Sequence, residues 1–146
     1  MTRGEACAIF SRLILGVQDV PNEYTTRFTD VKPGDWFYEE VAFLDEKGFF
    51  EQLTSSTYNP NGKITRAELV DLAVKASSLE IGTKLPEFTD VPADHFYYDS
   101  IIKAAAAGIV NGYEDETFRP DNRITRAEVV TVVNRLLGLK INEKTM

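Results

Sequence analysis

One hexapeptide occurs three times in this chain and constrains its fold more than any other feature. It reads Ile-Thr-Arg-Ala-Glu-Val at 124–129, recurs as Ile-Thr-Arg-Ala-Glu-Leu at 64–69, and recurs with changes as Met-Thr-Arg-Gly-Glu-Ala at 1–6. A Thr followed three residues later by Glu is the pattern of a capping box, in which each side chain accepts a hydrogen bond from the backbone N–H of the other. The apolar residues that flank two of the copies can pack as a hydrophobic staple. Three helices are therefore predicted to begin here.

The Arg of the hexapeptide is not explained by capping. Arg3, Arg66 and Arg126 would each occupy the first helical position, where a cation faces the positive end of the helix dipole at a cost of roughly 0.3–1 kcal/mol. Either a fixed Glu or Asp partner or an anionic ligand, held by the guanidinium together with the free N–H groups, would explain the repetition. The sequence leaves both explanations open.

A longer repeat surrounds the hexapeptide. The stretch Phe28-Thr29-Asp30-Val31 recurs 60 residues later at 88–91, and Arg66 recurs as Arg126 at the same shift. Within this register we expect helices over 2–16, 36–47, 65–77, 96–107 and 125–137. A glycine stands close to the end of four of them, and we predict Gly16, Gly48, Gly108 and Gly138 as helix stops.

The pattern predicts little sheet and a cluster of the three capped helices, with the shorter helices and the loops outside. The last helix carries two adjacent apolar stripes, which indicates contact with more than one neighbour. The stripes are Ala127, Val130, Val133 and Leu137, and Val129, Val132 and Leu136. Residues 140–146 are expected to be a frayed tail or the start of a linker.

Composition excludes several classes of function. Of 146 residues 43% are hydrophobic and 11% aromatic, which is typical of a globular protein, and the net charge is −7. An acidic chain argues against nucleic-acid binding and against a polybasic membrane contact, so any anion must be bound locally by particular Arg or Lys side chains. We find no transmembrane run and no signal-peptide pattern after Met1. Cys7 has no partner for an internal disulfide and falls on a core-facing helix position.

The second full unit closely resembles an S-layer homology (SLH) motif. It contains Phe-Thr-Asp-Val at 88–91, Gly-Ile-Val at 108–110, Asn-Gly-Tyr-Glu-Asp-Glu-Thr-Phe-Arg-Pro at 111–120 and Ile-Thr-Arg-Ala-Glu at 124–128. The resemblance covers 28–82 and 88–140 as repeats and 1–16 as the second half of another. We therefore predict one SLH-type module over 1–146.

The resemblance implies a mainly α, pseudo-threefold module with a central cluster of capped helices and peripheral short helices and loops. It also implies a non-catalytic cell-wall anchor of a bacterial surface protein, extracellular at the wall or S-layer. The expected partner is an anionic, often pyruvylated, secondary cell-wall polysaccharide. Nucleic acid, membrane insertion, cofactor and metal are not expected.

The resemblance also implies roles for particular residues. The Arg of each hexapeptide would contact the anionic sugar, an aromatic after the turn would stack on it, and the Gly-Tyr of the loop would approach it; the Asp of each Phe-Thr-Asp-Val stretch also matches the motif. The candidate ligand-binding residues are Arg3, Arg66, Arg126, Trp36, Asp30, Asp90, Gly112 and Tyr113.

Departures from the motif affect the first copy. Gln52-Leu53 replaces Gly-Tyr, Asn59 replaces the Arg before Pro, and Gly4 replaces Ala, so the binding groove that uses this loop is predicted to be weak or unused. The first half of one unit is absent. The chain is then a fragment or a module completed by another segment, and dimerisation or exchange with a second molecule is a hypothesis.

Structural roles compete with these ligand roles. Asp30 and Asp90 precede turns, where a carboxylate more often binds backbone amides or an Arg than a sugar. Trp36 could equally be core. The alternative function is a structural or protein-binding helical module whose Arg side chains form internal ion pairs. An enzyme is disfavoured, because the single His, His95, suits a capping or surface role at a helix start.

Overall fold

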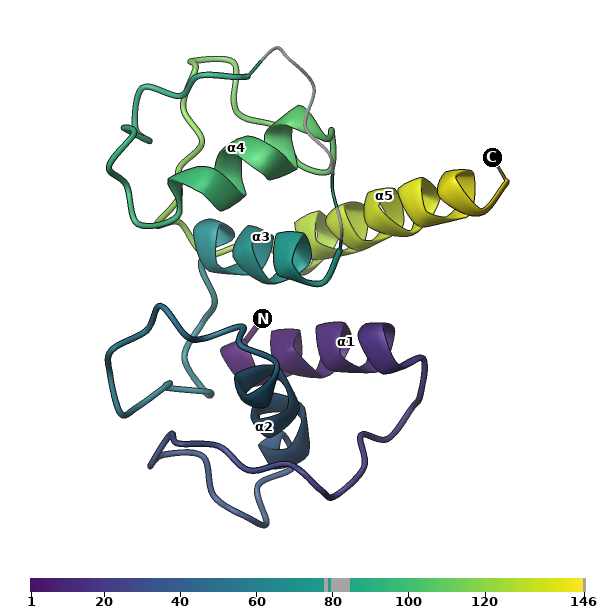
Figure 1. Ribbon diagram of the computed structural model, residues 1–146. Helices are drawn as coiled ribbons and strands as arrows, with labels where there is room; N and C mark the ends of the chain where they lie inside the picture. The colour runs from purple at the N-terminus through teal and green to yellow at the C-terminus, as the bar shows by residue number, and fades with distance from the viewer. Residues whose placement is uncertain (78, 80–84, 146) are drawn as a thin grey trace. The chain divides into compact units, whose positions relative to one another are not determined.

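The protein is mainly helical, as predicted. The computed structural model describes residues 1–77, 79 and 85–145, and five helices are found in these ranges (Figure 1). They are α1 (Arg3–Leu15), α2 (Tyr38–Glu46), α3 (Arg66–Lys75), α4 (Tyr98–Ala106) and α5 (Arg126–Thr145). Among these described residues, β pairing is limited to two single bridges, Thr2 with Lys63 and Thr65 with Arg123. The prediction of little sheet is confirmed.

The chain forms two compact units, unit 1 (Met1–Ile64) and unit 2 (Thr65–Met146). The division falls directly before the capping residue Thr65, so it does not follow the boundaries of the sequence repeat. Each unit instead combines a capped helix with the first half of the next repeat. The repeat ranges 28–82 and 88–140, and the clustering of all three capped helices, concern how the two units are placed and stay predictions.

Unit 1 is built by packing α1 against α2 (Figure 1). The buried face of α1 includes Phe10, and α2 contributes Val41 and Leu44, all with no more than a trace of exposed surface. Close approach is possible because Gly4 has no side chain: a Cβ there would lie 3.0 Å from a ring carbon of Phe37. The aromatic ring thus occupies the place of the Ala found in the other copies.

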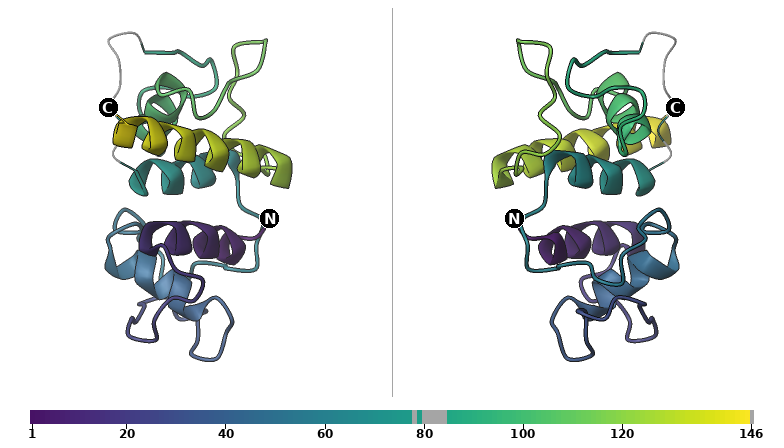
Figure 2. Two further views of the ribbon diagram at one scale, coloured as in Figure 1. Left: turned by 90° about the vertical axis from the view of Figure 1, so that its right-hand side faces the viewer. Right: turned by 90° about the vertical axis from the view of Figure 1, so that its left-hand side faces the viewer.

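Unit 2 places α3 beside both α4 and α5 (Figure 2). On α5 the stripe Val129, Val132 and Leu136 is buried, whereas Val130 of the other predicted stripe is 56% exposed. The wide apolar face of α5 is therefore only partly covered within unit 2.

All three predicted capping boxes are present. The backbone N–H of Glu5, Glu68 and Glu128 each donates a 3.1 Å hydrogen bond to the Thr hydroxyl oxygen three residues before it. Each Glu carboxylate accepts the N–H of that Thr in return. The hexapeptide therefore starts a helix at each of its three positions, because its own side chains satisfy two of the free donors.

The glycine stops are correct in three cases of four. Gly16, Gly48 and Gly108 have positive φ angles of 68°, 85° and 78°, which only glycine adopts without strain. Gly138 is not a stop, since α5 continues to Thr145, and the predicted tail is wrong for 140–145. A helical Gly costs only about 1 kcal/mol relative to Ala, and good helix formers such as Leu139 and Lys140 follow it.

Candidate functional site

Arg66 lies in a closed setting at the start of α3. Its side chain is nearly fully buried, with Nε donating to the carbonyl oxygen of Phe118 at 3.0 Å and Nη2 to that of Asn111 at 3.2 Å. Nη1 forms an ion pair with Glu128. The guanidinium carbon is 4.9 Å from the ring centre of Tyr113 and 4.7 Å from that of Phe118. For this residue the internal partner exists, and it is Glu128.

Glu128 serves two helices at once. Its Oε1 accepts the backbone N–H of Thr125 at 3.2 Å and so completes the capping box of α5, while Oε2 pairs with Arg66 of α3. One carboxylate thus fixes the start of α5 to the start of α3. Double use of both oxygens explains why this Glu is needed beyond capping alone.

A pocket of about 280 Å³ opens beside this ion pair within unit 2. Its floor is apolar, and its rim carries Asn111, Thr131 and Arg135. The lining residues are Arg66, Ile109, Val110, Asn111, Ile124, Ala127, Glu128, Thr131, Val132 and Arg135. Two guanidinium groups there meet one carboxylate, so the local charge is positive in a chain of net charge −7.

Arg135 is the pocket residue that sequence reasoning missed. It is exposed, and within the described ranges no ion pair or hydrogen bond involves its side chain. A signal existed in the helical spacing, because Arg135 follows Thr131 by four residues and Glu128 by seven, which places the three on one face. Arg66 has also used only three of its five N–H donors on protein partners.

Asp30 and Asp90 act on the backbone. The two carboxylate oxygens of Asp30 accept the N–H groups of Tyr58 and Asn59 at 2.9 and 2.7 Å. Those of Asp90 accept the N–H groups of Phe118 and Arg119 at 2.8 and 2.7 Å. Each Asp therefore ties the start of a repeat to the loop before the next capped helix.

Gly112 and Tyr113 shape the loop beside Arg66. A Cβ on Gly112 would lie 2.3 Å from a ring carbon of Phe88, so packing already requires the glycine. The Tyr113 ring lies against Arg66 and also against Arg119, whose guanidinium carbon is 3.8 Å from its centre. Arg119 in turn pairs with Asp115 at 3.5 Å, as the acidic loop predicted.

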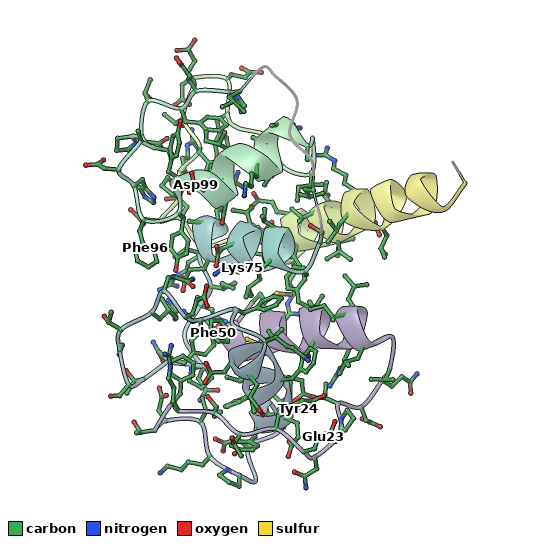
Figure 3. All side chains as sticks on the ribbon, viewed as in Figure 1. Glu23, Tyr24, Phe50, Lys75, Phe96 and Asp99 are labelled. Carbon is green, nitrogen blue, oxygen red and sulfur yellow. The ribbon has the colours of Figure 1, made fainter. Side chains whose placement is uncertain are left out.

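Trp36 and Phe96 are exposed aromatics at equivalent positions. Their exposed fractions are 57% and 60%, and each ring meets the next aromatic edge-on, Phe37 and Tyr97 respectively. Figure 3 shows Phe96 at the edge of its unit, on the turn that leads into α4. The core alternative for Trp36 is therefore wrong, and its indole face is open to solvent.

Arg3 and Arg126 occupy the positions of Arg66 in the other copies. Arg3 donates from Nη1 to the carbonyl oxygen of Asn59 at 3.5 Å, and Arg126 is exposed at the start of α5. The three motif arginines thus share a sequence but differ in burial. Ligand binding by them stays a prediction.

The residues outside this region have structural contacts. Nδ1 of His95 accepts the backbone N–H of Tyr97 at 3.1 Å, which is a capping role. Cys7 is buried with Sγ 3.3 Å from the hydroxyl of Tyr58. Over the described ranges, no cluster of three or more His, Cys, Asp or Glu side chains could hold a metal ion. Nor does any helix there have the length and apolar character needed to span a bilayer.

Comparison with known proteins identifies the repeat. The family model of the S-layer homology domain matches residues 27–70 and 87–130. The chain belongs to the S-layer homology domain family. Both matches begin just before a Phe-Thr-Asp-Val stretch and end within a capped helix, as the resemblance predicted.

Three curated SLH relatives each align with 94% of this chain. The cellulosome-anchoring protein of Acetivibrio thermocellus is 33% identical over 144 residues, and cell surface glycoprotein 1 of the same organism is 30% identical over 148. The surface-layer 125 kDa protein of Lysinibacillus sphaericus is 30% identical over 141 residues. The chain spans only 32%, 6% and 12% of these relatives respectively. These SLH relatives are surface-layer and cell-surface proteins.

Proposed function

We propose that this chain is a non-catalytic anchoring module that holds a bacterial surface protein on an anionic secondary cell-wall polysaccharide. The single observation that carries the proposal is the pocket of unit 2, with an apolar floor, Arg66 in its wall and Arg135 at its rim. The printed names of the relatives, among them a cellulosome-anchoring protein, support it. The expected location is the outer surface of the cell wall.

The pocket suits a pyruvyl ketal on such a polysaccharide. A pyruvyl ketal bears a methyl group and a carboxylate on one carbon atom, so it is apolar on one side and anionic on the other. Val110 and Val132 of the floor can bury the methyl group, while Arg135 and the remaining N–H donors of Arg66 face the carboxylate. Because the pocket is water-shielded on its apolar side, the charge interaction there is stronger than on open surface.

The other candidate residues divide into two groups under this proposal. Arg3, Arg126 and Trp36 contact the polysaccharide directly, with the exposed indole stacking on a sugar ring. Asp30, Asp90, Gly112 and Tyr113 hold the loops in the shape that the contact needs. The second group is proposed to act through the backbone and through Arg66.

The test is a pull-down of the full chain on purified cell-wall sacculi, before and after acid extraction of the non-peptidoglycan polymer. Binding that disappears on extraction, and that falls at least about tenfold in Arg135→Gln and Arg126→Gln, would support the proposal. Lys103→Gln on α4 is the matched control, because it removes one exposed positive charge away from the pocket. Equal binding by all variants would reject the assignment of the site.

A structural or protein-binding module is the second candidate. The observation that favours it is the ion pair of Arg66 with Glu128, which uses a motif Arg to build the fold. Under this alternative, extraction of the polymer leaves wall binding unchanged, and binding follows a protein component of the envelope. The same pull-down therefore separates the two candidates.

A further inference from the structure

Two of the three capped helices carry a half-repeat on the same face. We define a half-repeat as the segment from Phe-Thr-Asp-Val to the residue before the next capping Thr, that is 28–64 or 88–124. The half-repeat 28–64 packs on α1, and 88–124 packs on α3. In both pairs the helix precedes its half-repeat in the chain.

The contact has the same backbone geometry in both pairs. The N–H of Gly4 donates to the carbonyl oxygen of Pro60 at 2.8 Å, and the N–H of Ala67 donates to that of Pro120 at 3.0 Å. These are the second N–H groups of α1 and α3, which have no partner within their own helices. The turn before the next capping Thr thus caps the preceding helix from outside.

The helix face beneath each half-repeat is buried in the same pattern. The residues that follow the motif Arg by one, four and five positions are Gly4, Cys7 and Ala8 on α1, and Ala67, Val70 and Asp71 on α3. All six are buried. Polar groups on this face also have partners, since Cys7 meets the Tyr58 hydroxyl and Asp71 accepts from the Ser100 hydroxyl at 2.6 Å.

The corresponding face of α5 is open. Ala127, Val130 and Thr131 are all exposed, and so is Asn134 one turn further on. The backbone N–H of Ala127, equivalent to those of Gly4 and Ala67, has no acceptor in the part of the chain that the structure describes. The same hexapeptide therefore presents a seat with no half-repeat on it.

Counting the parts excludes self-assembly as the way to fill this seat. The chain has three capped helices and two half-repeats, so any number of copies, exchanged in any way, contains three helix faces for every two half-repeats. A second copy that filled the face of α5 would have to uncover its own α1 or α3. The occupant is therefore an additional half-repeat outside these 146 residues.

We propose that the face of α5 formed by Ala127, Val130, Thr131 and Asn134 binds a further half-repeat of the same sequence pattern, with the carbonyl oxygen of its turn Pro accepting the N–H of Ala127. Such a segment carries Phe-Thr-Asp-Val at its start and Asn-Pro-Asn-Gly or Arg-Pro-Asp-Asn near its end. Docking also adds a new wall at Ala127 and Thr131, two residues that line the pocket. The inference stands on internal symmetry and does not require the proposed polysaccharide function.

The test adds a synthetic polypeptide of residues 28–64 to the full chain and measures binding by calorimetry and amide hydrogen exchange. We expect one polypeptide per chain, new protection of the Ala127 amide, and binding at least about tenfold weaker in Val130→Asp, which would bury an unpaired charge. Leu85→Asp is the matched control, because Leu85 is an exposed aliphatic of the same unit outside this face.

Three outcomes would overturn the proposal. They are no binding, equal binding by Val130→Asp, and protection that changes only at Gly4 or Ala67, which would mean that the probe exchanges with a native half-repeat. Sedimentation gives a further check without the probe: the chain alone should be monomeric, and a dimer abolished by Val130→Asp would show that a second copy fills the face. No cell wall is present in either experiment, so the outcome is independent of the pull-down.

Discussion

The helices α3 and α5 begin with the same hexapeptide and the same capping box, yet their first turns lie in different surroundings. Arg66 is buried between two aromatic rings and paired with Glu128, whereas Arg126 is exposed. Ala67 is buried and its N–H is bonded to Pro120, whereas Ala127 is exposed. The hexapeptide encodes a helix start, and the half-repeat that packs on it determines whether its Arg is structural.

The largest difference is expected from removing the two arginines. Arg66→Ala deletes an ion pair, two hydrogen bonds to carbonyl groups and two cation–π contacts, and should lower the free energy of unfolding of unit 2 by roughly 2–4 kcal/mol. Arg126→Ala should change it by less than about 0.5 kcal/mol, because the side chain is exposed. Hydrogen exchange at the amides of α4 measures both. Equal losses would show that burial of Arg66 contributes nothing.

The loops of the two repeats provide the next comparison. Gly112→Ala places a Cβ against the Phe88 ring and should destabilise unit 2 by about 1–3 kcal/mol. Gln52 occupies the equivalent position of the first copy and already has a side chain, so Gln52→Ala should cost less than about 1 kcal/mol. Urea unfolding of both variants tests this. A harmless Gly112→Ala would mean that the Phe88 ring moves aside freely.

The aspartates that tie the loops should not distinguish the repeats. Asp30→Asn and Asp90→Asn each replace a carboxylate that accepts two backbone N–H groups by an amide with one acceptor oxygen. Each substitution should therefore cost about 1–2 kcal/mol in its own unit. Hydrogen exchange resolved by residue measures the two losses separately. A much larger loss in one unit would contradict the equivalence of the repeats.

The smallest expected effect is a pH dependence confined to the second loop. The Thr117 hydroxyl donates a 2.5 Å hydrogen bond to Asp115 and lowers the pKa of that carboxyl group. Because the folded-state pKa is depressed, this contribution to stability is present above the ordinary Asp pKa and is lost as the pH falls through the folded-state value. The first copy has Ser55 and Thr57 at these places, so its loop should show no such dependence.

An NMR titration of Asp115 in the wild-type chain and in Thr117→Val measures this shift. The pKa of Asp115 should rise toward its ordinary value in the variant, while the fold is retained because both side chains lie in a solvent-accessible loop. An unchanged pKa would assign the shift to Arg119, whose guanidinium lies 3.5 Å from Asp115.

The sequence by itself determined the elements that depend on local chemistry. Three capping boxes, three glycine stops with positive φ, the 60-residue register and the mainly helical class all follow from side chains and backbone groups a few residues apart. The same reasoning was wrong at Gly138, because a glycine permits a helix to end but does not force it to do so.

Only the tertiary structure decided which copy of a repeated residue does what. The Arg of the hexapeptide left an acidic partner and a ligand equally open, and the partner of Arg66 proved to be Glu128, 62 residues away. Arg135 and the pocket it lines depend on how α5 packs beside 109–111, which no local pattern contains. Identical hexapeptides give identical helix starts because capping is local, whereas burial and pairing are set by segments that are distant in the chain.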